Sequence, residues 1–380
     1  MQIYGYIANS NSEKVRSRGF TIAQRKFTIT AQYILFPVVL VLSTLQTGCY
    51  MLKQGTHLLS DRLQAVPVEK ILQSDNLTLE EEIFFSRIAS VNNFATDSLG
   101  LQKSKNYSKY IRTDSSYLAA VVSGAGTFST NPYLWKFPFI DEVPYKGFFK
   151  HEDAVLEAEK LSNKGFDTWI RGVDAFSTLG ITSDPLYSFM TDYSIHRIAE
   201  LIIHEQTHAT IWVPKQTQFN EEMAAFIGEA GAERYIADTY GENSQEMFTL
   251  LAEKRDRIHW VDDISELRIG LETLYSKNIP DTEKEILKQK TIVDFKDSFK
   301  EGYEGRYETD LYKKIPDLEI NNAFIALYAV YYEHNSLLMK LYRYCGESVS
   351  ALIELLKPLA ENRENPYDYI NTILKKPKPL

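Results

Sequence analysis

The chain has 380 residues, of which 13% are aromatic, and a formal net charge of −9. This length and apolar content can build one sizeable core, while the acidic balance and the lack of a basic aromatic patch argue against nucleic acid as a partner. There are two cysteines, Cys49 and Cys345. If Cys49 is modified as argued next, no internal disulfide can form and stability must come from the core.

The first 48 residues are expected to be an export signal rather than part of the fold. Basic residues precede an apolar run from Tyr33 to Leu42, and a Gly48-Cys49 pair follows soon after it. This order suits lipoprotein processing, which would leave Cys49 as a lipidated N terminus. An uncleaved anchor is the alternative, because residues 27–47 could just span a bilayer. Either way, the remaining domain, residues 49–380, is expected outside the cytoplasm, tethered to a membrane of the cell envelope.

Helical and strand-like patterns then follow in separate blocks. Apolar residues recur at helical spacing between Tyr50 and Leu99, and short aromatic or β-branched runs bounded by Gly, Pro and Asn follow between about 110 and 190. One helix is predicted within that second block, over residues 152–164. The predicted strands are residues 117–122, 135–139, 145–149 and 168–173. The chain is therefore expected to be α+β and mostly α-helical, with a small sheet beside a helical body.

The stretch from Asp174 to Gly180 is predicted to end this sheet as an edge strand. Its unpaired backbone could bind an extended peptide by strand addition, which is how many proteases hold their substrates. That hypothesis makes Asp174, Ala175, Ser177 and Thr178 substrate-binding residues. A plain strand and turn is the alternative interpretation.

A metal-binding motif lies in the next predicted helix, Ile195 onward, within a metal-binding part that spans about 193–240. His204 and His208 are four residues apart, so on a helix both imidazoles leave the same face one turn apart and can hold one metal ion. Glu205 lies beside them, where its carboxylate can act on a metal-bound water without being a ligand. This His-Glu-x-x-His pattern is typical of zincin proteases. Two core histidines bonded to backbone or water are the alternative.

A catalytic zinc needs a third protein ligand, and the sequence offers Glu221. The motif helix is expected to end near Val213-Pro214, and Asn220 is a plausible N-cap of a second helix that returns to the site. Glu221 shares a helix face with small residues, which permit close packing on the motif helix. These small residues are Ala224, Ala225, Gly228 and Ala232.

The C-terminal part, residues 244–374, is predicted to be helical. Charged, Leu-rich helices are expected over residues 244–274 and 282–300, and a long helix rich in Tyr over 320–343.

With these residues in view, the chain resembles a bacterial family of predicted zinc aminopeptidases that have an N-terminal lipoprotein signal and a His-Glu-x-x-His core followed by Phe-Asn-Glu. The likeness covers most of the chain from Cys49 onward. The stretches that carry it are 48–50, 135–138, 145–149, 175–180, the metal core and 321–323.

More broadly, the core is similar to that of the gluzincins, and this resemblance implies zinc held by His204, His208 and Glu221, with Glu205 as general base. Ala225 stands where the gluzincin helix often carries a carboxylate that supports a zinc histidine. Glu229, one turn further on, is expected to take that supporting role, and Asn220 is expected to assist beside the ligand.

In gluzincins a Tyr or His from the C-terminal subdomain stabilises the oxyanion, and the resemblance assigns this role to Tyr331, with His334 as an alternative. An aromatic core stripe is the other interpretation of these residues. An aminopeptidase must also bind the free α-ammonium group, for which Asp174, Glu222 and Glu229 are the candidate anions.

The function expected from the sequence is zinc-dependent hydrolysis of peptide bonds by a cell-envelope aminopeptidase. A zinc endopeptidase or other amidase on the same core is one alternative. A lipid-anchored envelope protein without enzymatic activity is the other, and it is disfavoured because Glu205 is present.

Overall fold

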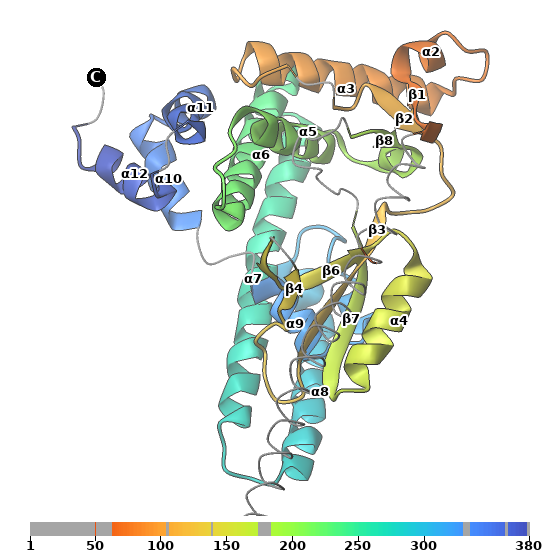
Figure 1. The fold of residues 1–380 in the computed structure, drawn as a ribbon, viewed down its shortest axis with the longest axis vertical. Helices are drawn as coiled ribbons and strands as arrows, with labels where there is room; N and C mark the ends of the chain where they lie inside the picture. Colours follow the sequence, from red (N-terminus) through yellow and green to blue (C-terminus); the bar gives the residue numbers. More distant parts are fainter. Residues whose placement is uncertain are drawn as a thin grey trace, which may run out of the picture. The chain divides into compact units, whose positions relative to one another are not determined.

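The structure is a computed structural model that describes residues 50, 63–103, 106–137, 140–173, 184–329, 335–361 and 364–377 (Figure 1). Contacts divide the chain into two units, Met1–Leu59 with Phe137–Ile140, and Ser60–Lys136 with Asp141–Leu380. In the first unit, the ring of Tyr50 lies 5.8 Å from that of Phe137. The second unit contains the metal-binding motif.

In the described part of the chain, all strands lie before residue 188 and all elements after it are helices. The strands are β1 (Val66–Pro67), β2 (Lys109–Ile111), β3 (Ala119–Gly126), β4 (Trp135–Phe137), β5 (Ile140–Val143), β6 (Tyr145–Phe148), β7 (Phe166–Val173) and β8 (Leu186–Tyr187). The α-helices are α2 (Val68–Leu72), α3 (Leu79–Asp97), α4 (His151–Ser162), α5 (Ile195–Thr210), α6 (Thr217–Tyr240), α7 (Gln245–Tyr275), α8 (Asp281–Arg306), α9 (Asn322–Ala329), α10 (Asn335–Tyr344), α11 (Val349–Leu356) and α12 (Pro366–Leu374).

The main sheet has the order β6-β3-β7 and is antiparallel throughout. Neighbouring residues of β3 point to opposite faces. The Cα of Gly124 faces Leu161 of α4, whereas the hydroxyl of Ser123 donates to the Ala323 carbonyl of α9 at 3.3 Å. Helices therefore cover both faces, which explains why β3 is a continuous buried run rather than an alternating one.

A second, smaller sheet has the order β1-β2-β8, with β2 and β8 parallel. Its strands of two or three residues are too short to show a periodic pattern, so it was not predictable from the sequence. It brings the segment just before α5 next to the segment that follows α3.

Helices α3, α5 and α6 form the core around the motif, together with the C-terminal helices α10 to α12. Thr78 and Glu81 form a reciprocal capping box that starts α3. Gly241 ends α6 with a φ of 97°, a backbone conformation that glycine adopts without steric cost. Most of α5 is buried, as expected for a helix that holds a site inside the protein.

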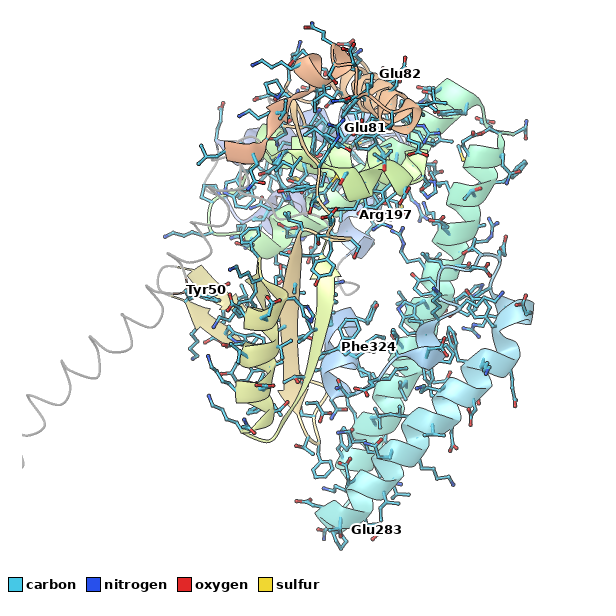
Figure 2. The ribbon with its side chains drawn as sticks, turned by 90° about the vertical axis from the view of Figure 1, so that its right-hand side faces the viewer. Tyr50, Glu81, Glu82, Arg197, Glu283 and Phe324 are labelled. Carbon is cyan, nitrogen blue, oxygen red and sulfur yellow. The ribbon has the colours of Figure 1, made fainter. Side chains whose placement is uncertain are left out.

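The long helices α7 and α8 pair with each other and with α9 around the fully buried Trp260. Phe324 of α9 lies between the sheet and these helices (Figure 2), with ring centroids 4.9 Å from Trp169 of β7 and 6.1 Å from Trp260 of α7. At the end of the sheet, the buried Lys288 of α8 donates to Asp167 at 2.7 Å. This ion pair links the sheet to the helical hairpin.

The expectation of an α+β, mostly helical chain is confirmed. The predicted helices over 152–164, 244–274 and 282–300 correspond to α4, α7 and α8. The predicted helix over 320–343 is represented by two helices, α9 and α10, and residues 330–334 between them lie outside the described part. Within the described ranges, none of the helices combines the length and the hydrophobicity that crossing a bilayer requires.

Candidate metal centre

Helix α5 presents its two motif histidines toward each other. Their Nε2 atoms are 3.1 Å apart, and the rings stand nearly perpendicular, with an interplanar angle of 86°. The side chain of His208 is buried, whereas that of His204 is 23% exposed. In a neutral imidazole one ring nitrogen is a donor and the other an acceptor, so two facing Nε2 atoms need a shared proton or a shared cation.

Glu221 reaches the same point from the first turns of α6. Its carboxylate oxygens lie 3.7 Å from Nε2 of His204 and 3.5 Å from Nε2 of His208. The side chain is half exposed. The structure thus brings together the three side chains that the sequence predicts as ligands, and their nearest donor atoms all lie within 4.8 Å of one another.

This convergence depends on the close approach of α5 and α6. Gly228 faces the motif helix so closely that a Cβ placed on it would lie 3.0 Å from the Glu200 carbonyl oxygen and 3.2 Å from Cβ of His204. Ala224, on the same side of α6, is fully buried. The small face of α6 therefore packs on α5 as predicted, with the correction that Ala225 is exposed.

The electrostatics of the three side chains are coupled. Burial alone would raise the pKa of Glu221, but hydrogen bonds and the positive charge from His204 and His208 outweigh it and lower the pKa to about 2. Burial acts to lower the pKa of His204, and Glu221, Glu205 and Glu200 raise it overall. Glu221 is therefore held as a carboxylate, the form in which it could bind a metal.

Glu205 is buried next to the histidines, with 6% of its surface exposed. Its charge also acts on Tyr107, whose pKa is raised well above the ordinary value, mainly by burial and in addition by Glu205. The backbone of Tyr107 is in the left-handed region, with a φ of 62°. Its N–H donates to the Asp184 carbonyl at 2.8 Å, which holds this loop in place. Tyr107 was not among the predicted site residues, because no spacing pattern in the sequence connects it to the motif.

Asn220 has a different role from the predicted N-cap. Helix α6 begins at Thr217, so Asn220 lies inside its first turn and is fully buried. Its side-chain amide donates to the Val213 carbonyl and its side-chain oxygen accepts from the Val213 N–H, both at 2.9 Å. Asn220 therefore ties the loop after α5 to α6, one residue before Glu221.

Among the residues that the structure describes, Glu229 forms its ion pairs with cations of α7 and not with the motif histidines. Its carboxylate lies 3.1 Å from Nζ of Lys254 and 3.9 Å from Nη1 of Arg257, both on α7. Its predicted support of a zinc histidine stays a prediction.

Several predicted residues fall outside the described part of the chain. They are Cys49, the proposed substrate-binding residues Asp174, Ala175, Ser177 and Thr178, and the proposed oxyanion stabilisers Tyr331 and His334.

The donor set fits a zinc ion. Two nitrogen donors and one carboxylate form a typical catalytic zinc set that leaves one position open. Bonds of about 2.1 Å at the tetrahedral angle place ligand atoms about 3.4 Å from each other, and the observed separations are 3.1, 3.5 and 3.7 Å. With Nε2 as the donor atom, the proton of His208 sits on Nδ1, which meets no hydrogen-bond acceptor within the described ranges.

A family model described as "Putative aminopeptidase" matches residues 49–367. The chain belongs to this family. The match covers the metal-binding motif and both helices that carry it, and it begins at the predicted lipidation residue Cys49. No curated protein and no solved structure matches the chain. Membership of this aminopeptidase family indicates an enzyme that hydrolyses peptides.

Proposed function

We propose that this protein is a zinc-dependent aminopeptidase with a gluzincin-like core. The observation that carries the proposal is the convergence of His204, His208 and Glu221 on one point beside the buried carboxylate of Glu205. A structural metal site is closed and does not need an unligated carboxylate next to it. The family match supports the peptide substrate class.

His204, His208 and Glu221 would hold the zinc ion. When bound, zinc supplies Lewis-acid polarisation of a carbonyl and lowers the pKa of water to near neutrality.

Glu205 is the proposed general base. It takes a proton from the attacking water as the water oxygen bonds to the scissile carbonyl carbon. It then gives this proton to the amine nitrogen as the carbon–nitrogen bond breaks. Because Glu205 follows His204 directly on a buried, well-anchored helix, its carboxylate is held next to the reacting atoms.

The proposed location is the cell envelope, with the domain anchored through a lipidated Cys49. The order of basic residues, apolar run and Gly48-Cys49 supports this location. Mass spectrometry of the mature N terminus tests it: an acylated N-terminal Cys49 is expected, and an N terminus at any other residue contradicts it.

The central experiment separates metal binding from catalysis. Glu205→Gln should keep zinc and lose activity by at least about a hundredfold, whereas His208→Ala and Glu221→Ala should lose both. Glu222→Gln is the matched control, because Glu222 accepts from Gln218 and Tyr367 instead of facing the histidines. Zinc content is measured on protein purified without chelator, and activity on aminoacyl amides.

Three results would contradict the proposal. Full activity of Glu205→Gln would show that Glu205 is not the general base. Equal zinc content in wild type and Glu221→Ala would show that Glu221 is not the third ligand. Cleavage of a long peptide blocked at both ends, at a rate comparable with that of free-amine substrates, would favour the endopeptidase alternative on the same core.

A further inference from the structure

A partly exposed carboxylate lies one helical turn before the first motif histidine. Glu200 and His204 are four residues apart on α5, so their side chains leave neighbouring positions of the same helix face. Exposed or half-buried residues follow this face from Arg197, which Figure 2 labels, through Glu200 to His204, whereas the rest of the helix is mostly buried. Glu200 is therefore on the accessible side of the candidate metal centre.

The carboxylate of Glu200 is held near Arg257 without a short hydrogen bond to it. Its carboxylate lies 3.5 Å from Nη1 of Arg257, beyond the usual N–H···O distance of about 2.9 Å. Arg257 is shared with Glu229, which Lys254 already pairs at 3.1 Å. Glu229 is thus paired closely by α7, while Glu200 has a longer contact with Arg257 and, among the residues that the structure describes, keeps lone pairs for a further donor.

Close packing of α6 on α5 holds the backbone of Glu200 near the donors. Gly228 lies against the Glu200 carbonyl, and the exposed Ala225 is one turn from Glu221. Ala225, one turn after Glu221 and one turn before Glu229, is small and exposed, so it leaves room for a substrate to extend from the centre toward Glu200.

The spacing limits what this carboxylate can meet. One helical turn is about 5.4 Å. In a substrate, the α-nitrogen lies about 2.5 Å from the carbonyl carbon of its own residue, and each further extended residue adds about 3.4 Å. If Glu200 binds a cation about one helical turn from the scissile carbonyl, that cation can be the α-ammonium group of a substrate with one or two residues before the cleaved bond. An internal peptide would place only neutral amides there.

We propose that Glu200 determines specificity by binding the positively charged α-ammonium group of the substrate, with Arg257 orienting its carboxylate. This inference rests on the proposed peptidase function and names its substrate class as peptides with a free amino terminus. It assigns the role to Glu200 in place of Glu229 or Glu222, because both of these are already engaged by other side chains.

The test compares zinc-loaded wild type and Glu200→Gln on fluorogenic aminoacyl and dipeptidyl amides, each with a free and with an N-acetylated amine. Glu200→Gln should raise KM for the free-amine substrates at least tenfold, with kcat changed less than threefold and zinc content unchanged. Rates on the acetylated substrates should not change. Glu200→Asp, which keeps the charge, should recover part of the loss.

Glu233→Gln is the matched control. Glu233 belongs to the same surface cluster and pairs with Lys254 at 3.0 Å, but it lies three turns beyond Glu221 on α6. Its ratio of kcat/KM for free over acetylated substrates should stay within twofold of wild type.

A pH profile adds a readout that a merely structural role would not change. A peptide α-amino group loses its proton near pH 7.7–8.0, so wild-type kcat/KM on free-amine substrates should fall above that pH. This fall should flatten in Glu200→Gln.

An equal effect of Glu200→Gln on free and acetylated substrates, or no effect on either, overturns the inference. If wild type is active and Glu205→Gln is not, the proposed function survives that result. If zinc-loaded wild type hydrolyses none of the substrates, the proposed function fails and this inference fails with it.

Discussion

Replacement by alanine is expected to change the free energy of unfolding in opposite directions at two glycines inside helices, Gly228 and Gly270. Gly228 lies where α6 approaches α5, and an added Cβ would be 3.0 Å from the Glu200 carbonyl oxygen and 3.2 Å from Cβ of His204. Gly270 lies on the exposed surface of α7, where an added Cβ meets nothing within 4 Å. Both carry ordinary helical backbone, so neither is required for its conformation.

The magnitudes follow from two competing effects. Replacing an interior helical glycine by alanine gains about 0.8–1 kcal/mol of helix propensity, and Gly270→Ala should show this gain. At Gly228 the gain is offset by overpacking, which costs about 1–3 kcal/mol. The neighbours there are helix backbone and a Cβ atom, which cannot rotate away. We expect a net loss of about 0–2 kcal/mol for Gly228→Ala.

Gly228→Ala should also weaken metal binding, since the two helices must separate by a few tenths of an ångström and carry His204 away from Glu221. Urea unfolding gives the free energies, and competition with a chromophoric chelator gives zinc affinity. Gly270→Ala is the control for both measurements. If Gly228→Ala is stabilised as much as Gly270→Ala and binds zinc as tightly as wild type, the tight packing of α5 on α6 is refuted.

Further predictions concern the sheet, the first long helix and the metal. Lys288→Met should lower the unfolding free energy by about 3–5 kcal/mol, because Asp167 is left without its buried partner; a loss below about 1 kcal/mol in urea unfolding would contradict this. The hydrogen bond from Arg112 lowers the pKa of Glu81 against the effect of burial. The ionised Glu81 therefore stabilises the fold above its ordinary pKa of 4.5, and this stabilisation is lost as the pH falls further. The difference in unfolding free energy between wild type and Glu81→Gln should accordingly shrink from pH 7 to pH 3. Added zinc should raise the unfolding midpoint of wild type but not of His208→Ala, as measured by thermal scans.

The convergence of the three candidate ligands could be predicted from the sequence because their relative positions depend on local geometry. His204 and His208 belong to one helix, and four-residue spacing alone places them on one face. Glu221 required a second step, the inference that a helix with small residues on one side packs closely on its neighbour. Gly228 confirms that step.

The surroundings of the ligands could not be predicted because they depend on contacts between distant segments. Tyr107 comes from the loop before β2, and Glu229 pairs with residues of α7. Asn220 has the composition of an N-cap, but α6 begins one turn earlier and the side chain turns inward. The small sheet β1-β2-β8 could not be predicted for the same reason, since pairing between distant short strands leaves no periodic signal in the sequence.

Asn220 fixes the position of α6 at the metal end, and its removal should show how much the centre depends on preorganisation. Asn220→Ala leaves the buried N–H of Val213 without its partner, at a cost of about 1–3 kcal/mol if no water replaces it, and leaves the Val213 carbonyl with the longer hydrogen bond from the Gln216 N–H at 3.3 Å. The loop between α5 and α6 is then free to move Glu221 relative to the histidines. Zinc affinity should therefore fall by about 10–100-fold, as for the loss of other groups that orient metal ligands. Asn220→Asp keeps the acceptor for the Val213 N–H but sets a buried carboxylate oxygen against the Val213 carbonyl oxygen, so it should lose at least as much stability as Asn220→Ala. Zinc affinity is measured by chelator competition. If it is unchanged in Asn220→Ala, close packing at Gly228 positions Glu221 without the hydrogen bonds between Asn220 and Val213.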